Sequence, residues 1–299
     1  MDELIEKEII RGLSKLLRNS PGRTVAEAEP IRKAVANVLC RTTSRHWTTY
    51  VVGGAVRDLL LGPRGAWPRD LDIIVDGCST DELERLFEDI TIRRNSFGGL
   101  HLRQTVRFEG FAAVGYDLLF DVWRLEDTWG IKARALTPTI TNFLITPFLN
   151  IDSIAVALTA KNRLAVYEHG FSQAVKTRTL EINNEPNPFP FVCAIRSLIL
   201  AAKLDFWLGS QLARFIHTLM LSAPISELVR AQLLHYGQVR CGEDDIKEWL
   251  LNLRSQLEEG ADRVRLLNNP YRQTHLWEDW PPRTEVREEE EQKSRSLRV

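Results

Sequence analysis

Two aspartates one residue apart, Asp70 and Asp72, are the side chains whose type and spacing most directly suggest chemistry in this 299-residue chain. The apolar residues Leu71, Ile73 and Val75 alternate with them, which is the period of a β-strand, so both carboxylates should point to one face. Neighbouring carboxylates repel each other unless a cation lies between them, and their hard oxygens suit Mg²⁺. We therefore predict a divalent-cation site, filled by Mg²⁺ with Mn²⁺ as a substitute.

A glycine pair upstream is positioned to receive a phosphate. The β-forming run 50–52 leads into Gly53 and Gly54, and residues 55–61 then have helical character. Glycines let a ligand approach the backbone closely, and the unpaired amides of a first helical turn favour an anion. Arg57 in that turn would add a permanent positive charge. Paired carboxylates beside such a cradle suit phosphoryl transfer with two metal ions, roughly 3.5–4 Å apart.

Each feature also has a simpler explanation. A D-x-D pair is common on exposed strand ends, and a G-G-x-x-R segment is more often a turn than a phosphate site. The prediction therefore depends on the two features occurring together and in this order.

The two segments together resemble a known family. GGAVRDLLLG at 53–62 followed by RDLDIIVDG at 69–77 is similar to the signature of CCA-adding enzymes and bacterial poly(A) polymerases, within the polymerase β-like nucleotidyltransferases. The resemblance implies an enzyme that transfers a nucleotide from a nucleoside triphosphate to a hydroxyl and releases pyrophosphate. It implies an α+β fold, in which a head with a mixed β-sheet flanked by helices precedes an all-helical neck and body. We count Asp58 with Gly53, Gly54 and Arg57 among the candidate nucleotide-binding residues.

Two further segments continue the resemblance. R-x-x-F-G loops of the family face the sugar of the incoming nucleotide, and Arg94, Phe97 and Gly98 match that pattern, although a hairpin turn with solvated arginines would look the same. The family's third acid falls at Asp121 in YDLLFDVWRL, with Asp117 as the reserve candidate. The predicted catalytic and metal-binding set is therefore Asp70, Asp72 and Asp121.

The base-reading region departs from the family. In FLNIDSIAVAL the acid is kept as Asp152, but the family's two preceding arginines are replaced. In EPNPFPFVCAIR, which ends at Arg196, Pro186, Asn187 and Pro190 stand where the family has the E, D and R that read cytosine and adenine. An asparagine can pair with adenine through two hydrogen bonds, worth about 1–3 kcal/mol of discrimination. We therefore predict an adenine-preferring site that includes Asn187 and Arg196, with Asn187 as a cap of a helix starting near Pro188 as the alternative.

Composition narrows the surroundings and the partners. The chain is 44% hydrophobic and 26% charged, lacks a run of about 20 apolar residues and begins with an acidic amphipathic segment, so we expect a cytoplasmic protein that binds no membrane. The net charge of −1 argues against a strong grip on a long nucleic acid. The four cysteines and six histidines show no paired ligand spacing, so neither a zinc site nor a disulfide framework is expected.

Periodicity and composition divide the chain into four parts. We expect N-terminal helices at 1–44, the catalytic head at 45–165, a helical neck and body at 166–262, and a flexible charged tail at 263–299. A partner protein could bind the helical body or the tail. Apolar spacing and turn residues predict helices at the following positions: 3–18, 25–41, 80–89, 189–204, 209–220, 225–237 and 243–258.

The sequence leaves the acceptor open. The candidates are the 3′ end of an RNA, as in CCA addition or poly(A) synthesis, a nucleotide that starts an oligonucleotide signal as in bacterial antiphage defence, and a protein hydroxyl. The donor could be a ribo- or a deoxyribonucleoside triphosphate. A catalytically silent module that binds nucleotides and regulates a partner is the alternative outside the enzymes.

Overall fold

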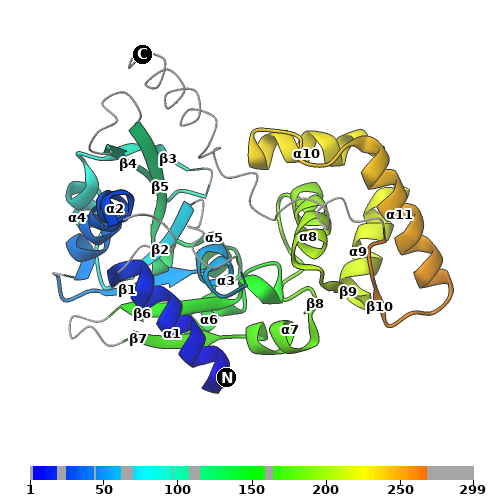
Figure 1. The fold of residues 1–299 in the computed structure, drawn as a ribbon, viewed down its shortest axis with the longest axis horizontal. Coiled ribbons are helices and arrows are strands. Elements are labelled where there is room, and N and C mark those ends of the chain that lie inside the picture. The colour runs from blue at the N-terminus through cyan, green and yellow to red at the C-terminus, as the bar shows by residue number, and fades with distance from the viewer. Residues whose placement is uncertain are drawn as a thin grey trace, which may run out of the picture.

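The computed structural model describes residues 3–18, 25–43, 45–61, 70–95, 97–107, 115–158 and 164–267. The predicted turn-rich loop at 62–69 and the chain beyond 267 lie outside these residues. Within them, a seven-stranded mixed sheet with flanking helices forms the head, and a largely helical neck follows it (Figure 1). This confirms the predicted α+β fold.

The head sheet has the strand order β3-β4-β5-β2-β1-β6-β7. Every neighbouring pair is antiparallel except β2 and β5, which run parallel at the centre. The strands have these bounds: β1 Thr48–Val52, β2 Asp70–Asp76, β3 Thr91–Arg94, β4 Leu100–Arg107, β5 Gly115–Arg124, β6 Ile154–Leu158 and β7 Leu164–Glu168. The parallel central pair brings two segments about fifty positions apart in sequence into direct register.

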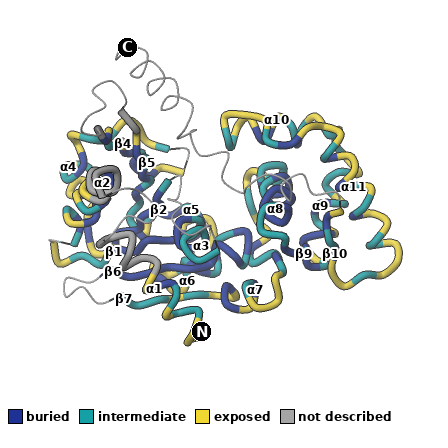
Figure 2. The backbone as a smooth tube through the Cα atoms, viewed as in Figure 1, coloured by how far each residue is buried: buried dark blue, intermediate teal, exposed yellow. Residues whose placement is uncertain are grey.

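The two faces of the sheet differ in their cover. The main core packs against one face and continues into the neck, and the head helices that contribute to it are α1 Glu3–Arg18, α2 Val25–Thr43, α3 Gly54–Leu61 and α4 Thr80–Phe87. A smaller apolar cluster covers part of the opposite face with residues from α6 Ile140–Leu144, which follows α5 Trp129–Ala133. Buried residues accordingly follow the central strands and the first long neck helix (Figure 2).

Helix α4 illustrates how local sequence sets an element boundary. Ser79 caps it: the Ser79 side chain accepts a hydrogen bond from the Glu82 amide, and the Glu82 carboxylate accepts one from the Ser79 amide. The predicted capping box is therefore present, although the helix ends at Phe87, two residues before the predicted end. Helix α4 contributes Leu83 and Phe87 to the main core.

The neck differs in one respect from the all-helical prediction, because a three-stranded sheet in the order β10-β9-β8 lies within it. Residues expected in a flexible tail belong to this folded part, since β10 pairs with β9 and both Val264 and Leu266 are buried. The neck elements are α7 Phe171–Thr177, β8 Thr179–Leu180, α8 Pro190–Leu204, β9 Trp207–Gly209, α9 Ser210–Leu221, α10 Ser226–Tyr236, α11 Glu243–Glu258 and β10 Arg263–Val264.

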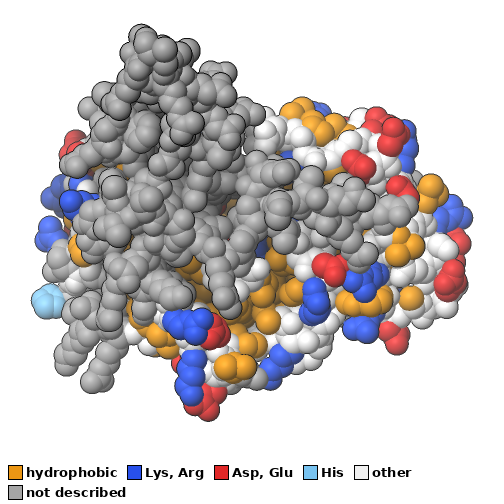
Figure 3. Space-filling model, viewed as in Figure 1, with side chains coloured by type: hydrophobic (Ala, Val, Ile, Leu, Met, Phe, Trp, Pro, Cys, Tyr) orange, Lys and Arg blue, Asp and Glu red, His pale blue; other side chains and the backbone are white. Residues whose placement is uncertain are grey.

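Surface and helix composition add two observations. Acidic and basic side chains are intermixed over the neck in the view of Figure 3. Within the described residues no single helix is long and apolar enough to cross a bilayer, and α9 with α10, bent by 116°, meets that test only as a pair.

Candidate active site

The sheet register places the predicted acids side by side. Asp72 of β2 pairs with Asp121 of β5, and Asp70 lies two residues before Asp72 on the same face. The same row continues to His101 of β4 on one side and to Val52 of β1 on the other. Two carboxylates predicted from separate segments are thus direct neighbours at the edge of the sheet where β1 ends and β2 begins.

The electrostatics around Asp72 show a concentration of negative charge. Burial, followed by the nearby carboxylates of Asp70 and Asp121, raises the pKa of Asp72 well above its ordinary value, while the positive charge of Arg196 opposes this rise. An all-oxygen donor set with repelling charges suits a hard divalent cation. The residue types therefore fit the predicted metal.

The positions of these acids are a separate matter. No set of three or more His, Cys, Asp or Glu side chains is placed to hold a metal ion within the part of the chain that the structure describes. Asp121 already has two partners, because its Oδ1 accepts a hydrogen bond from Asn95 Nδ2 at 3.0 Å and lies 2.9 Å from His101 Nδ1. Ligation by Asp121 would require its carboxylate to turn away from, or share, these two partners.

The reserve candidate, Asp117, lies further along the same strand. Its carboxylate accepts a hydrogen bond from Thr105 Oγ1 at 2.7 Å and lies 3.4 Å from Arg103 Nη1. Because it is four residues from Asp121 and pairs with Thr105 in the register, it is distant from the row that contains Asp72. The register therefore favours Asp121 over Asp117 as the third acid.

The glycine pair lies directly beside the acids, for two different reasons. Gly53 has φ +64°, a conformation that favours glycine, and a Cβ placed on it would lie 3.9 Å from Asp72 Oδ2. Its amide donates to the Ile154 carbonyl at 3.0 Å, so the turn is tied to β6. A Cβ on Gly54 would lie 3.3 Å from Arg57 Nη2, so this glycine makes room for the guanidinium.

Three of the predicted nucleotide ligands belong to one network: the buried Asp152 joins Arg57 to Arg196, and Asp58 bonds Arg57 directly. Arg57 donates to Asp58 Oδ1 at 2.7 Å and to Asp152 Oδ1 at 2.5 Å, while Arg196 Nη1 lies 2.8 Å from Asp152 Oδ2. Burial by itself would raise the pKa of Asp152, but Arg196 and Arg57 outweigh it and hold that pKa below its usual value. Burial would lower the pKa of Arg57, and the carboxylates of Asp58 and Asp152 raise it instead.

This network links the head to the neck. It connects α3, the 3₁₀ turn Asn150–Asp152 before β6, and α8. The geometry gives Arg57 the task of holding Asp152 in place, and its predicted contact with phosphate stays a prediction. Arg196 serves the network and also brings positive charge near Asp72.

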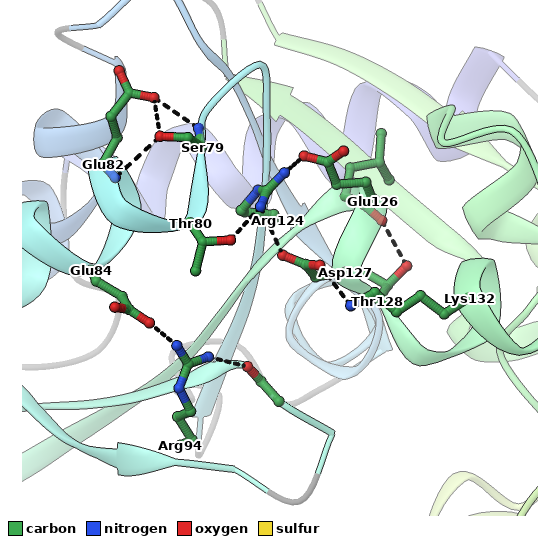
Figure 4. Close-up of polar contacts among 12 residues, drawn as sticks. Ser79, Thr80, Glu82, Glu84, Arg94, Arg124, Glu126, Asp127, Thr128 and Lys132 are labelled. Carbon is green, nitrogen blue, oxygen red and sulfur yellow. Dashed lines mark hydrogen bonds and ion pairs between the residues drawn. The ribbon is translucent and has the colours of Figure 1, made fainter.

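The structure differs from the sequence expectation at Arg94. Arg94 pairs with Leu100, and Leu100 with Val122, so Arg94 belongs to the core face of the sheet, opposite the acids. There it forms an ion pair with Glu84 of α4 and donates to the Gly98 carbonyl at 3.1 Å (Figure 4). The R-x-x-F-G spacing cannot determine which of two adjacent arginines faces the site, because successive residues of a strand point to opposite faces.

Arg93 is the arginine on the acid face. It pairs with His101, which pairs with Asp121, after a register irregularity between Thr91 and Arg93. Its side chain is exposed, and within the described residues it makes no hydrogen bond or ion pair. Sequence reasoning missed Arg93 and His101, whose only signal was their spacing from the Phe97-Gly98 turn.

The turn that carries Phe97 and Gly98 is organised by Asn95, another residue that sequence reasoning missed. Asn95 Oδ1 accepts hydrogen bonds from the Phe97 amide at 3.1 Å and the Gly99 amide at 2.9 Å, while its Nδ2 reaches Asp121. Gly98 has φ +85°, which explains a glycine there. The turn between β3 and β4 is thus tied to the third acid through one side chain.

Asn187 makes a local hydrogen bond but does not cap a helix as the alternative to base reading expected, because Phe189 is the N-cap residue of α8 and the helix has no side-chain cap. Its Oδ1 accepts a hydrogen bond from the Phe189 amide at 2.9 Å, a local turn that precedes α8, which begins at Pro190. Because this bond engages the oxygen that adenine would need, recognition of adenine by Asn187 stays a prediction. Phe189 itself contacts Phe97 of the head, with ring centroids 5.8 Å apart.

Comparisons with known proteins agree with this fold. Residues 49–111 match the family model of the poly A polymerase head domain. Among solved structures, a CCA-adding enzyme in complex with ATP is 16% identical with a TM-score of 0.51, and covers 82% of this chain and 55% of its own. The family match confirms the resemblance of the head, and the structure of the CCA-adding enzyme with ATP has a fold similar to that of this chain.

Two further solved structures give weaker similarity. A tRNA nucleotidyltransferase complexed with a primer tRNA and an incoming ATP analog is 21% identical, with a TM-score of 0.47 over 75% of this chain and 61% of its own. The Thermotoga maritima CCA-adding enzyme complexed with tRNA is 16% identical, with a TM-score of 0.47 over 83% and 62%. This chain therefore spans less than two thirds of the length of these structures, and no curated protein matches it.

Proposed function

We propose that this protein is a divalent-cation-dependent nucleotidyltransferase that transfers a nucleotide, with adenylate preferred, from a nucleoside triphosphate to a hydroxyl. The observation that carries the proposal is the register of Asp72 with Asp121 on parallel strands, with Asp70 on the same face and Gly53 against Asp72. Carboxylates gathered at one position repel one another, so they lower the stability of the fold unless a bound cation offsets their charge.

Each part of the chain has a role in this proposal. Asp70, Asp72 and Asp121 would hold the metal, and Mg²⁺ bound there would neutralise the triphosphate and lower the pKa of the acceptor hydroxyl. The backbone amides at the start of α3 face the donor phosphates. Arg93 adds positive charge on the same face, in the row that contains His101 and Asp121.

The proposed reaction balances as a single displacement. The acceptor oxygen forms a bond to the α-phosphorus, and the bond from the α-phosphorus to the oxygen bridging to the β-phosphorus breaks. Pyrophosphate leaves with that electron pair, and the hydroxyl proton passes to solvent. The Arg57–Asp152–Arg196 network supports the step indirectly by keeping the glycine turn and α8 in place.

For the acceptor, we propose a nucleic-acid 3′ end as the first to test. The similarity of the head to poly A polymerase heads favours such an acceptor over a protein hydroxyl. The net charge of −1 favours a short or loosely held nucleic acid over one gripped along its length.

The test is transfer from each of the four nucleoside triphosphates, labelled at the α-phosphate, to a short RNA and to tRNA. We expect pyrophosphate release that requires Mg²⁺ or Mn²⁺, is largest with ATP and is lost with EDTA. Mass spectrometry of the product identifies the acceptor, including any nucleotide attached to the protein itself.

The matched variants are the double substitution Asp70→Asn with Asp72→Asn, and Asp117→Asn as the control on the same face. Full activity in the double variant would refute the proposed site. Metal-dependent binding of triphosphate without transfer to any acceptor would instead identify a silent nucleotide-binding module.

A further inference from the structure

Two exposed aromatic rings from different parts of the chain meet between the head and the neck. Phe97 in the β3–β4 turn is 39% exposed and Phe189 before α8 is 44% exposed. Their centroids lie 5.8 Å apart with an interplanar angle of 88°, an edge-to-face contact. Large apolar rings that remain this exposed while packing on each other present free faces to a ligand.

The first ring is anchored to the acid site. The Phe97 amide donates to Asn95 Oδ1, and Asn95 Nδ2 donates to Asp121 Oδ1. One side chain therefore connects the backbone of Phe97 to the third predicted metal ligand. A group stacked on Phe97 would lie close to whatever Asp121 binds.

The second ring is anchored to the neck. The Phe189 amide donates to Asn187 Oδ1, and α8 begins at the next residue, Pro190. Further along α8, Arg196 reaches the buried Asp152 and through it Arg57. The position of Phe189 relative to the head is therefore fixed by a buried ion network and not only by the ring contact.

We propose that Phe97 and Phe189 form an aromatic clamp that holds the base of the donor nucleotide by stacking. This inference rests on the proposed function and specifies how its base is selected. A base would stack on the face of one ring and displace the edge of the other. Stacking on aromatic side chains is tolerant of base identity because every base has a π-face.

The residues around the clamp favour selection of the base by the area of its stacking face over selection by hydrogen bonds to its edge. The segment before α8 carries Pro186, Pro188 and Pro190 around Asn187, whose Oδ1 is already bonded to Phe189. The clamp would take purine nucleoside triphosphates, which offer larger faces than pyrimidines. A clamp that only stacks makes no hydrogen bonds to the edge of the base, and one such pair of bonds discriminates by about tenfold or more. The rates with ATP and GTP should therefore differ by less than about tenfold.

The experiment uses 2-aminopurine riboside triphosphate, whose fluorescence is quenched by stacking, titrated into the full chain with Mg²⁺ and no acceptor. Quenching is expected in the wild type, and Phe97→Leu and Phe189→Leu should each reduce it and weaken binding by about tenfold. Phe97→Tyr should retain both the quenching and the affinity for the probe. The matched control is Tyr167→Leu, which removes an equally exposed ring in an edge-to-face pair with Tyr50.

Steady-state transfer separates this inference from the proposed function. The Leu variants should raise KM for ATP about tenfold with kcat unchanged, while thermal unfolding confirms that each is folded. If the wild type transfers nucleotides but the Leu variants behave like Tyr167→Leu, or if GTP is rejected far more strongly than tenfold, the clamp is refuted and the function stands. A wild type that neither binds the probe nor transfers a nucleotide refutes both.

Discussion

The two faces of the head sheet are built from alternating residues of the same strands, yet they are organised for opposite purposes. On β2, Ile73 is fully buried in the main core, while its neighbour Asp72 faces Asp70 and Asp121. On β3, Arg94 pairs with Glu84 behind the sheet, while Arg93 lies on the acid face. One face gains stability from apolar burial, and the other brings carboxylates together at Asp72, where Arg196 offsets part of their charge.

The largest expected effect comes from a substitution on the acid face of β2. Asp72→Asn should reduce nucleotide transfer by about 10³-fold, since several kcal/mol of charge stabilisation are lost with one metal ligand. Its free energy of unfolding without divalent cation should not fall, because the change relieves repulsion with Asp70 and Asp121. Steady-state transfer assays and urea denaturation measure the two quantities. A stability loss comparable to that of a core substitution would mean that Asp72 is structural.

The second effect concerns the two adjacent arginines. Arg93→Ala should weaken triphosphate binding by about 10–100-fold, because a hydrogen bond to a charged group contributes about 1.5–3 kcal/mol. Arg94→Ala is the matched control. Because it removes an exposed ion pair, it should lower the free energy of unfolding by at most about 1 kcal/mol and leave KM unchanged. Measurements of KM for ATP and of thermal unfolding test both variants. Equal effects of the two substitutions on KM would contradict the assignment of the faces.

The third effect tests the core face beside the site. Ile73→Val should lower the free energy of unfolding by about 0.5–1.5 kcal/mol, since a buried methylene is lost. Transfer by the folded fraction should be unchanged, because the side chain points away from the acids. Urea denaturation and transfer assays at a temperature well below unfolding measure this. A large fall in kcat would show that the core face controls the position of Asp72.

The smallest effect defines how far the site extends along β5. Asp117→Asn should leave kcat and KM within about twofold of the wild type, because Asp117 bonds Thr105 and lies outside the Asp72 row. Surface changes of this kind also alter stability by only about 0.5 kcal/mol. The comparison with Asp121→Asn, under the same assay, is the measurement. If Asp117→Asn is the more damaging of the two, the third acid has been assigned to the wrong residue.

The sequence was sufficient where the signal is local. The alternation around Asp70 and Asp72 predicts the strand, and Ser79 with Glu82 predicts the start of α4, because both depend on residues a few positions apart. The main helices of the neck follow from apolar spacing for the same reason. The boundary of the folded neck was misplaced at 263, because a two-residue strand such as β10 has too little periodicity to be recognised.

By itself, then, the sequence determined the longer elements, the kind of fold, and which acids and glycines to consider, since these are properties of short stretches and of a recognisable motif. Only the tertiary structure decided that Arg93 and not Arg94 shares a face with Asp121, that Arg57 is engaged by Asp152, and that Phe97 meets Phe189. These facts depend on strand register and on contacts between residues that are far apart in the chain. One irregularity in pairing, as between Thr91 and Arg93, is enough to change which side chain faces the site.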